Sequence, residues 1–509
     1  MMTGRLPIRI GFVGDHWLGD VLLASARGGL PHNETTLPEL LGTVGYASLA
    51  LGKWHLGQQP QHLPTSHGFD SYYGIPYSVD MGSSAWDYFS GKHAVYNPPL
   101  PLLSSTSPGE LTILEQPTDL NLLTGRYVHK ADRFIANHSS ARRPWLLYMA
   151  FSHVHTPDFA STTAWPKGCN VTLRGRFGDA LFELDEAIGS LLASVRSAQA
   201  LESTLVLFTS DNGPWLTKGL AGGSAGLLRD GKQTTWEGGV RVPGLASWTG
   251  RITPGRVSTA VVATYDIFVT ALALAGVPLP KDRQIDGRDI SELLFNDSHS
   301  ASPHDCIYHW KGAPGMGCPA AHPDCPGLFA VRCGAYKMHW VTMDSVGPEA
   351  WRGIFHDPPL LYQLEYDPSE AHPVDAKSAE YASIRKLLEA AKAAHLASIE
   401  QVPNQVALGQ DADLKVCCDV DSKHKYPTLP VCTCAAQNFR AQVCEPVGHH
   451  TSATVAPGGR VSGAEGVEQQ QQQQQQQAEE AEAETSIDPF DPLDDSTWPA
   501  RPMERHKFG

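Results

Sequence analysis

Two short apolar runs separated by a helical pattern constrain the fold of this chain most strongly. Residues 145–151 (WLLYMAF) and 204–209 (TLVLFT) have the length and composition of buried parallel strands. Between them, apolar residues recur at steps of three and four, which is typical of an amphipathic helix. Strand, helix and strand at this spacing form a βαβ unit, so the sequence predicts an α/β domain with helices on both faces of its sheet.

Two helices are predicted around these strands. Residues 122–135 form the first, with Tyr127, Ala131 and Phe134 on one face. The apolar face of the second is formed by Phe177, Leu181, Leu184, Ile188, Leu191, Leu192 and Val195.

The character of the sequence changes after about residue 305. Residues 329–341 read as a hairpin around Cys333–Ala335, residues 361–364 as a further strand, and residues 377–399 as a helix. We therefore predict a main domain over residues 1–305 and a small antiparallel-sheet domain over residues 306–445. Residues 446–509, which contain nine consecutive glutamines at 469–477, are predicted to be disordered.

Composition excludes some classes of partner. The net charge of −15 argues against a nucleic-acid partner. No stretch approaches the roughly 18 apolar residues of a membrane span, and Pro7, Arg9 and Gly11 interrupt the place where a secretory signal would have its apolar region. Glycosylation sequons nevertheless favour a secretory history; they stand at Asn33, Asn137, Asn170 and Asn296.

The cysteines point the same way. Half of the ten fall within 28 residues of an irregular, Pro-rich segment: Cys417, Cys418, Cys432, Cys434 and Cys444. This density favours disulfides of undetermined connectivity. A zinc knuckle is the alternative, but its usual Cys-x2–4-Cys spacing is absent.

The segment Gly52–Gly57 (GKWHLG) places two basic side chains two residues apart between glycines. In an extended chain, Lys53 and His55 face one side and Trp54 the other. An ammonium and an imidazole that converge in this way form an anion site. The alternative is a solvated edge strand with a protective lysine.

Both apolar runs lead into polar residues that suit a binding site. The first ends at His153 and His155 and the second at Asp211 and Asn212. Because ligands bind beyond the carboxyl ends of parallel strands, we expect these side chains at one rim, with His153 supporting and His155 reaching the ligand. The oxygens of Asp211 and Asn212 suit Ca²⁺ or Mg²⁺, although Asp-Asn-Gly is also a common turn.

A glycine-rich stretch over residues 222–243 carries Lys232. Its glycines permit the backbone to approach a ligand closely. The order of a phosphate-binding P-loop, Gly-x4-Gly-Lys-Ser/Thr, is absent. The alternative is a flexible surface loop.

Together these segments resemble the sulfatase family, and within it the arylsulfatases. The resemblance runs in order from about residue 3 to about residue 436. It is carried by residues 45–57, 74–78, 153–157, 211–214 and 231–243, the hairpin with Arg332 and Lys337, the strand at 361–368, and the cysteines at 417–434. It implies an alkaline-phosphatase-like fold: a mixed, mostly parallel sheet flanked by helices, with a smaller C-terminal antiparallel-sheet domain. It also implies a lysosomal or extracellular location.

The resemblance implies sulfate-ester hydrolysis. In this family a cysteine in Cys-x-Pro-Ser-Arg becomes formylglycine, and its hydrate attacks sulfur beside a divalent cation. By position, the sulfate oxygens would be held by Lys53, His55, His155 and Lys232, with His55 also positioning the hydrate.

The remaining implied roles concern the cation and the substrate. Asp211 and Asn212 would be ligands of Ca²⁺ or Mg²⁺, and the cation would polarise the sulfate. Ser78 would line the pocket of a sulfated small molecule, lipid or glycan. The resemblance leaves a homo-oligomer open.

The sequence departs from the family at the nucleophile. None of its ten cysteines is followed by x-Pro-Ser-Arg, and Met1–Pro7 resembles the segment downstream of that motif in the family. The family's first strand, with two further aspartate ligands, has no counterpart here. We therefore expect an N-terminally truncated sulfatase, from an incomplete gene model or an internal start, with no measurable arylsulfatase activity.

Two other functions stay open at this point. The first is a catalytically dead sulfatase-like binder of sulfated glycans or lipids. The second is a phosphatase or phosphodiesterase on the related fold. The second is disfavoured, because two metal ions would need clusters of Asp and His, whereas Asp211–Asn212 is the one clear metal pair in the sequence.

Overall fold

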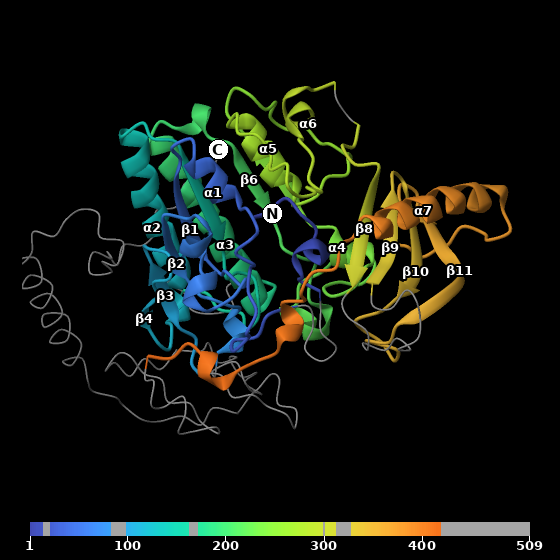
Figure 1. The fold of residues 1–509 in the computed structure, drawn as a ribbon, viewed down its shortest axis with the longest axis horizontal. Coiled ribbons are helices and arrows are strands. Elements are labelled where there is room, and N and C mark those ends of the chain that lie inside the picture. Colours follow the sequence, from blue (N-terminus) through green and yellow to red (C-terminus); the bar gives the residue numbers. More distant parts are fainter. Residues whose placement is uncertain (14–20, 83–97, 162–171, 299–300, 312–326, 419–509) are drawn as a thin grey trace, which may run out of the picture. The chain divides into compact units, whose positions relative to one another are not determined.

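The computed structural model describes residues 1–13, 21–82, 98–161, 172–298, 301–311 and 327–418 (Figure 1). All of them fall in one compact unit. A five-stranded mixed sheet has the strand order β4-β3-β2-β1-β5. Its strands are β1 (Ala47–Gly52), β2 (Ser71–Gly74), β3 (Leu102–Ser105), β4 (Thr112–Glu115) and β5 (Trp145–Ala150).

Strand β1 is the centre of this sheet. It pairs in parallel with β2 on one side, where Leu49 lies opposite Ser71, and with β5 on the other, where Leu49 lies opposite Leu147. All six residues of β1 are buried. This explains its near-continuous apolar sequence, because a parallel strand between two others is covered on both faces.

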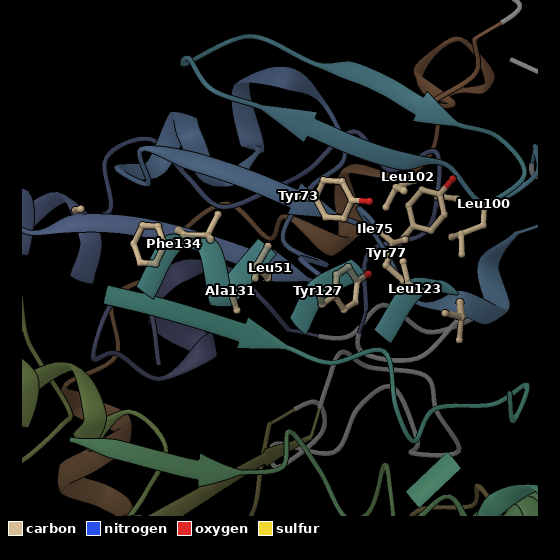
Figure 2. Close-up of a cluster of buried hydrophobic side chains, with 14 residues drawn as sticks. Leu51, Tyr73, Ile75, Tyr77, Leu100, Leu102, Leu123, Tyr127, Ala131 and Phe134 are labelled. Carbon is tan, nitrogen blue, oxygen red and sulfur yellow. The ribbon is translucent and has the colours of Figure 1, made fainter. Parts of the chain in front are cut away.

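Helix α2 (Leu120–Ser140) covers this sheet with the predicted face. Tyr127 and Ala131 are fully buried and Phe134 is nearly so. They join the main hydrophobic cluster with Leu51, Tyr73 and other sheet residues (Figure 2). The side chain of Asp119 caps the helix by accepting a hydrogen bond from the Asn121 backbone N–H at 2.9 Å.

The strand predicted at 204–209 is present but differs from expectation. Strand β6 (Val206–Thr209) pairs antiparallel with β7 (Gly244–Ser247) in a separate two-stranded sheet, not in parallel with β5. Strands β5 and β6 are both half-buried and not buried as predicted. Within the described ranges each has one edge without a paired strand, and that edge is less covered than the edges of β1.

Helix α3 (Gly175–Ser197) spans the predicted segment, but its predicted face is partly wrong. Leu184 and Val195 are buried, whereas Leu181 is 42% exposed. Asp179 and Glu183 are buried in its place. Periodicity did not identify these carboxylates, because each is held by specific partners: Asp179 accepts from the Thr172 N–H and Glu183 from the Ser161 N–H, both at 2.9 Å.

The C-terminal sheet has the order β11-β10-β9-β8, with all neighbours antiparallel. Its strands are β8 (Cys306–Lys311), β9 (Gly327–Cys333), β10 (Tyr336–Thr342) and β11 (Ile354–Gln363), and helix α7 (Ala379–Ala397) packs on it. The predicted hairpin is confirmed, and Gly334 adopts the positive φ of 57° that its tight turn requires.

Disulfides are present, as the cysteine density predicted. Cys306 and Cys333 are bonded across β8 and β9. Cys417 and Cys418 are also disulfide-bonded. The other three cysteines of the C-terminal group and residues 446–509 lie outside the described residues.

Shorter elements complete the described chain. The α-helices are α1 (Leu37–Gly42), α4 (Glu237–Val240), α5 (Asp266–Leu274) and α6 (Ser291–Phe295). The 3-10 helices are η1 (Pro7–Ile10), η2 (Pro60–His62), η3 (Pro64–His67), η4 (Val79–Met81), η6 (Leu201–Ser203), η7 (Leu216–Ala221), η8 (Val406–Leu408) and η9 (Ala412–Leu414). In the part of the chain described, no helix combines the length and apolarity that crossing a bilayer requires.

Adjacent leucines on α7 provide a matched test of this packing. Leu388 is fully buried against the C-terminal sheet, whereas Leu387 is 53% exposed. We predict that Leu388→Ala lowers the apparent free energy of unfolding in urea by about 2–5 kcal/mol through transfer and cavity costs. Leu387→Ala should stay within about 0.5 kcal/mol of the parent chain. Equal losses for the two variants would contradict this packing.

Candidate active site

The residues after β1 are fixed by backbone hydrogen bonds to both neighbouring strands. The N–H of Lys53 donates to Ala150 O at 2.8 Å, at the end of β5. On the β2 side, the N–H groups of Trp54 and His55 donate to Ile75 O and Pro76 O at 3.0 and 2.9 Å. The segment therefore continues the sheet centre, and the edge-strand alternative is wrong.

Trp54 turns away from the basic pair, as alternation predicts. Its ring is buried in a second apolar cluster and packs edge-on against Phe69 at 6.3 Å. Lys53 and His55 are only half-buried. The Nε2 of His55 lies 2.8 Å from Leu22 O, so this nitrogen carries the proton. Burial lowers the pKa of His55 well below its ordinary value, and the nearby Lys53 lowers it further.

His155 and Lys232, 77 residues apart, meet directly. The Nζ of Lys232 lies 3.2 Å from His155 Nε2, and His155 Nδ1 lies 2.7 Å from Thr156 O. Because a carbonyl only accepts, Nδ1 carries the proton and Nε2 accepts from the Lys232 ammonium. Burial is the main cause that lowers the pKa of His155 to about 4; Asp80 opposes the shift, and Lys232 and Lys53 add to it.

The cations share one local field. Burial lowers the pKa of Lys232, and repulsion from Lys53 lowers it further against the attraction of Asp211 and Asp80. The Nζ of Lys53 lies 3.9 Å from Asp211 Oδ2, whose side chain is 70% exposed. The four basic groups predicted from sequence are thus brought together, with Asp80 and Asp211 as the carboxylates that the described residues place beside them, and basic groups clustered in this way can bind an anion.

Ser78 lies one contact away from this cluster. Its side chain is buried and its hydroxyl donates to the Asp80 carboxylate. Asp80 Oδ1 in turn lies 3.9 Å from His155 Nδ1. The predicted pocket-lining role of Ser78 stays a prediction, and the contact that the structure gives it is with Asp80.

Three further residues at the site, Trp215, Lys218 and Asp80, escaped the sequence analysis. The ring of Trp215 packs 5.5 Å from that of His155. The ammonium groups of Lys232 and Lys218 lie 4.6 and 4.4 Å from its centroid, at cation–π distance. Their position directly after the Asp211–Pro214 motif was the available signal, as was the position of Asp80 two residues after Ser78.

His153 has the supporting place expected for it. It is buried and its Nε2 lies 3.2 Å from Glu183 Oε2 on α3. The same carboxylate oxygen accepts the N–H of Ser161 at 2.9 Å. His153 therefore anchors the turn after β5 while His155 faces the cations.

The glycines around Lys232 are required by close packing. A Cβ on Gly213 would lie 1.8 Å from Gly238 O, and a Cβ on Gly239 would lie 2.4 Å from Gly231 O. The N–H of Lys232 donates to Pro214 O at 2.8 Å. The backbone therefore ties Lys232 to the end of β6, and a flexible surface loop is wrong for residues 231–239, most of which are buried.

The side-chain oxygens of Asp211 and Asn212 are ligands of the type that a hard cation prefers, but two of them are too few to fill its coordination shell. Ca²⁺ takes about six to eight oxygen ligands. The Nδ2 of Asn212 donates to Gly213 O at 2.9 Å. Among the residues with described coordinates, no group of three or more His, Cys, Asp or Glu side chains could hold a metal ion. Two such ligands alone do not make a tight site for Ca²⁺ or Mg²⁺.

This donor set predicts weak calcium binding. We expect a dissociation constant of about 1 mM or weaker for CaCl2 by isothermal titration calorimetry, because two protein ligands leave most of the shell to water. Asp211→Asn should weaken binding at least fivefold, and the matched surface variant Asp305→Asn should not. A micromolar constant, or no effect of Asp211→Asn, would contradict this.

Comparison with known proteins shows the family of this chain. Residues 1–277 match the sulfatase family and residues 302–434 match the C-terminal region of aryl-sulfatase. Arylsulfatase A of Homo sapiens is 37% identical over 443 residues, 82% of each protein. Arylsulfatase G of Canis lupus familiaris is 38% identical over 415 residues, 75% of this chain and 72% of that protein.

A solved structure extends the likeness to the fold. The PsFucS1 sulfatase from Pseudoalteromonas sp. is similar with a TM-score of 0.65 and 27% identity, covering 79% of this chain and 80% of that chain. The expected alkaline-phosphatase-like fold with its C-terminal antiparallel sheet is confirmed. Since the family match spans more than half of the sequence and its relatives are arylsulfatases, this chain belongs to the sulfatase family of sulfuric ester hydrolases.

Proposed function

We propose that Lys53, His55, His155 and Lys232 bind the sulfate group of a sulfate ester, and that the reaction they serve is hydrolysis of that ester. The observation that carries the proposal is the 3.2 Å contact between Lys232 Nζ and His155 Nε2 beside a second ammonium, Lys53. A sulfate placed there would receive hydrogen bonds from charged donors, and these strengthen as negative charge grows in the transition state.

The protonation state of His155 suits a role in leaving-group departure. Without an anion, its Nε2 accepts from Lys232. A bound sulfate would draw the ammonium towards itself and raise the low pKa of the imidazole. His155 would then carry a proton that it can donate to the departing oxygen, with Lys232 beside it. His55, whose Nε2–H is held by Leu22 O, would present its other nitrogen on the nucleophile side.

A divalent cation and a formylglycine belong to the same proposal. Asp211 and Asn212 would supply two ligands to a weakly bound Ca²⁺ or Mg²⁺. The nucleophile is not assigned to a residue of this sequence, because none of its ten cysteines precedes x-Pro-Ser-Arg.

That same observation supports a second candidate function, a non-enzymatic binder of sulfated glycans or lipids. It would use the identical cation cluster for recognition without turnover. The two functions share their binding step and differ only in the products formed.

The organic part of the substrate is proposed to meet Trp215. This ring packs against His155 and Lys232, the two residues proposed to act on the departing oxygen. Relatives named steryl-sulfatase and N-acetylgalactosamine-6-sulfatase are 31% and 33% identical to this chain. A ring-shaped sulfated small molecule, lipid or glycan therefore fits the proposal.

We further propose a lysosomal or extracellular location for a glycosylated protein. Three sequon asparagines, Asn33, Asn137 and Asn296, are exposed and accessible to a glycan. The disulfide between Cys306 and Cys333 supports an oxidising compartment.

The binding step is tested by titrating sodium sulfate and an aryl sulfate into the chain. We predict that Lys232→Met weakens sulfate binding by about tenfold or more, the loss of one charge-assisted hydrogen bond. Lys386→Met, on the exposed side of α7, is the matched control and should bind normally. Absence of sulfate binding by the parent chain would overturn the proposed function.

Turnover measured in the same samples separates the two candidates. Release of a chromogenic phenol that Lys232→Met abolishes supports the hydrolase. Binding without release supports the non-enzymatic binder.

The pH dependence of sulfate binding tests the role of His155. Its pKa of about 4 leaves the ring neutral above pH 5. Because bound sulfate favours the imidazolium, binding takes up a proton, and we predict that affinity rises as pH falls from 7 to 5. His155→Asn should flatten this slope in calorimetric titrations. A slope that persists in the variant would exclude His155 as its source.

A further inference from the structure

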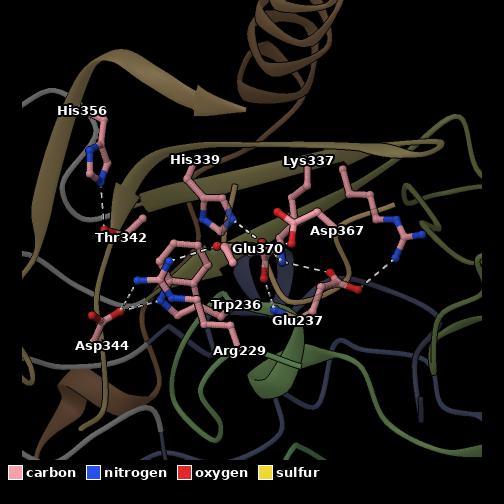
Figure 3. Close-up of polar contacts among 12 residues, drawn as sticks. Arg229, Trp236, Glu237, Lys337, His339, Thr342, Asp344, His356, Asp367 and Glu370 are labelled. Carbon is pink, nitrogen blue, oxygen red and sulfur yellow. Dashed lines mark hydrogen bonds and ion pairs between the residues drawn. The ribbon is translucent and has the colours of Figure 1, made fainter. Parts of the chain in front are cut away.

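The loop that carries Lys232 rests on the C-terminal sheet through buried charges (Figure 3). Glu237, the first residue of α4, is buried, and so is Lys337 on β10. The Oε1 of Glu237 accepts from Lys337 Nζ at 3.0 Å and its Oε2 accepts from Arg332 Nη1 at 3.2 Å. Two cations of the C-terminal sheet thus hold a carboxylate five residues after Lys232.

Glu370 closes this cluster from the other side. Its Oε2 accepts the backbone N–H of Glu237 at 2.6 Å, and its Oε1 accepts from His339 Nε2 at 2.7 Å. Lys337 Nζ lies 3.3 Å from the same Oε1. Burial alone would raise the pKa of Glu370, but His339 and Lys337 hold it at about 2, so the carboxylate stays charged. Glu370 therefore holds Glu237 in two ways. It accepts the backbone N–H of Glu237, and it contacts Lys337, the cation that pairs with the Glu237 carboxylate.

The residues before Lys232 are held in the same way. Asp230 accepts the backbone N–H of Ser345 at 2.8 Å and also the Ser345 hydroxyl. Arg229 stacks on the Trp236 ring at 3.6 Å, and Trp236 Nε1 donates to Asp344 Oδ1 at 2.7 Å. The loop is therefore attached on both sides of Lys232, to the connection between β10 and β11 before it and to β9 and β10 after it.

These attachments offset a strained backbone. Asp230 has a φ of 57° and Gln233 a φ of 74°, so Lys232 lies between two non-glycine residues in the left-handed region. Each such residue costs about 1 kcal/mol or more and persists only where its surroundings hold it. None of the contacts described for Glu237 or Glu370 involves a basic residue of the anion site, so any influence on that site passes through the loop.

We propose that Glu370 and Glu237 are positioning residues that set where the Lys232 ammonium stands in the anion site. This inference rests on the proposed function in one respect, which is that Lys232 binds the sulfate. Neither carboxylate contacts the anion. Their task is to hold residues 229–241 in the one conformation that brings Nζ to His155, and the C-terminal sheet is thereby part of the active site's support.

The first test reads Lys232 directly and needs no sulfate. Competitive acetylation of lysine amines, followed by mass spectrometry across a pH series, gives the pKa of Lys232, which burial keeps below its ordinary value. In Glu370→Gln the loosened loop should admit water, and the Lys232 profile should move up towards an ordinary lysine. Glu389→Gln is the matched control, since Glu389 accepts from Trp340 on the same half of the chain; its profile should equal the parent's. An unchanged Lys232 profile in Glu370→Gln overturns the proposal.

A milder variant guards against misfolding. Arg332→Met removes one of the two cations that hold Glu237 and leaves Lys337, His339 and Glu370 in place. If Glu370→Gln does not fold by circular dichroism, Arg332→Met decides. A shift of the Lys232 profile in the same direction supports the proposal, and no shift overturns it.

A double-mutant cycle separates positioning from general support. Glu370→Gln should weaken sulfate binding about fivefold or more in the parent chain and have no effect in the Lys232→Met background. An equal loss in both backgrounds would show a role that does not pass through Lys232 and would overturn the proposal. If the parent chain does not bind sulfate, the proposed function fails, and the acetylation profiles still decide the positioning role.

Discussion

Repulsion between like charges is the constraint on which the rest of this structure depends. Two ammonium groups, Lys53 and Lys232, repel each other beside the two imidazoles that follow β1 and β5, and Asp80 and Asp211 are the described carboxylates near them. Burial keeps the two imidazoles neutral by lowering the pKa of His55 and His155, and repulsion from the ammonium groups lowers both values further. Hydrogen bonds to Ala150 and Pro214 fix the backbones from which the two ammonium groups extend. A bound anion would lower the repulsion between the two ammonium groups, and the site therefore favours anion binding.

Rigid parts of the chain hold the basic groups close together despite their repulsion. Strand β1 is buried and paired on both sides, and it therefore fixes Lys53 and His55. Lys232 has no strand of its own and depends on the buried cluster of Glu237, Lys337 and Glu370. A buried ion cluster is weak evidence for stability, because desolvation offsets much of the attraction. Its value here is geometric, because it holds a strained loop against the C-terminal sheet.

The sequence predicted the local features of this molecule well and the long-range ones in part. The alternation of side chains correctly predicted that Trp54 points into the core. Helical periodicity correctly predicted the burial of Tyr127, Ala131 and Phe134. Those signals depend on neighbours a few residues apart. Periodicity failed at Leu181, which is exposed, and composition failed to show that β6 pairs antiparallel with β7. The buried pair of Glu237 and Lys337, 100 residues apart, leaves no periodic trace in the chain. Asp80, Trp215 and Lys218 escaped for a similar reason, since only the folded loops bring them to His155.

The most direct test of the central claim is a crystal structure of this chain grown with a sulfate ester or inorganic sulfate. The account predicts one sulfate whose oxygens lie about 3 Å from Lys53 Nζ, Lys232 Nζ and His155 Nε2, the distance of charge-assisted hydrogen bonds. Sulfate bound at another surface, with these three nitrogens pointing apart, would contradict it.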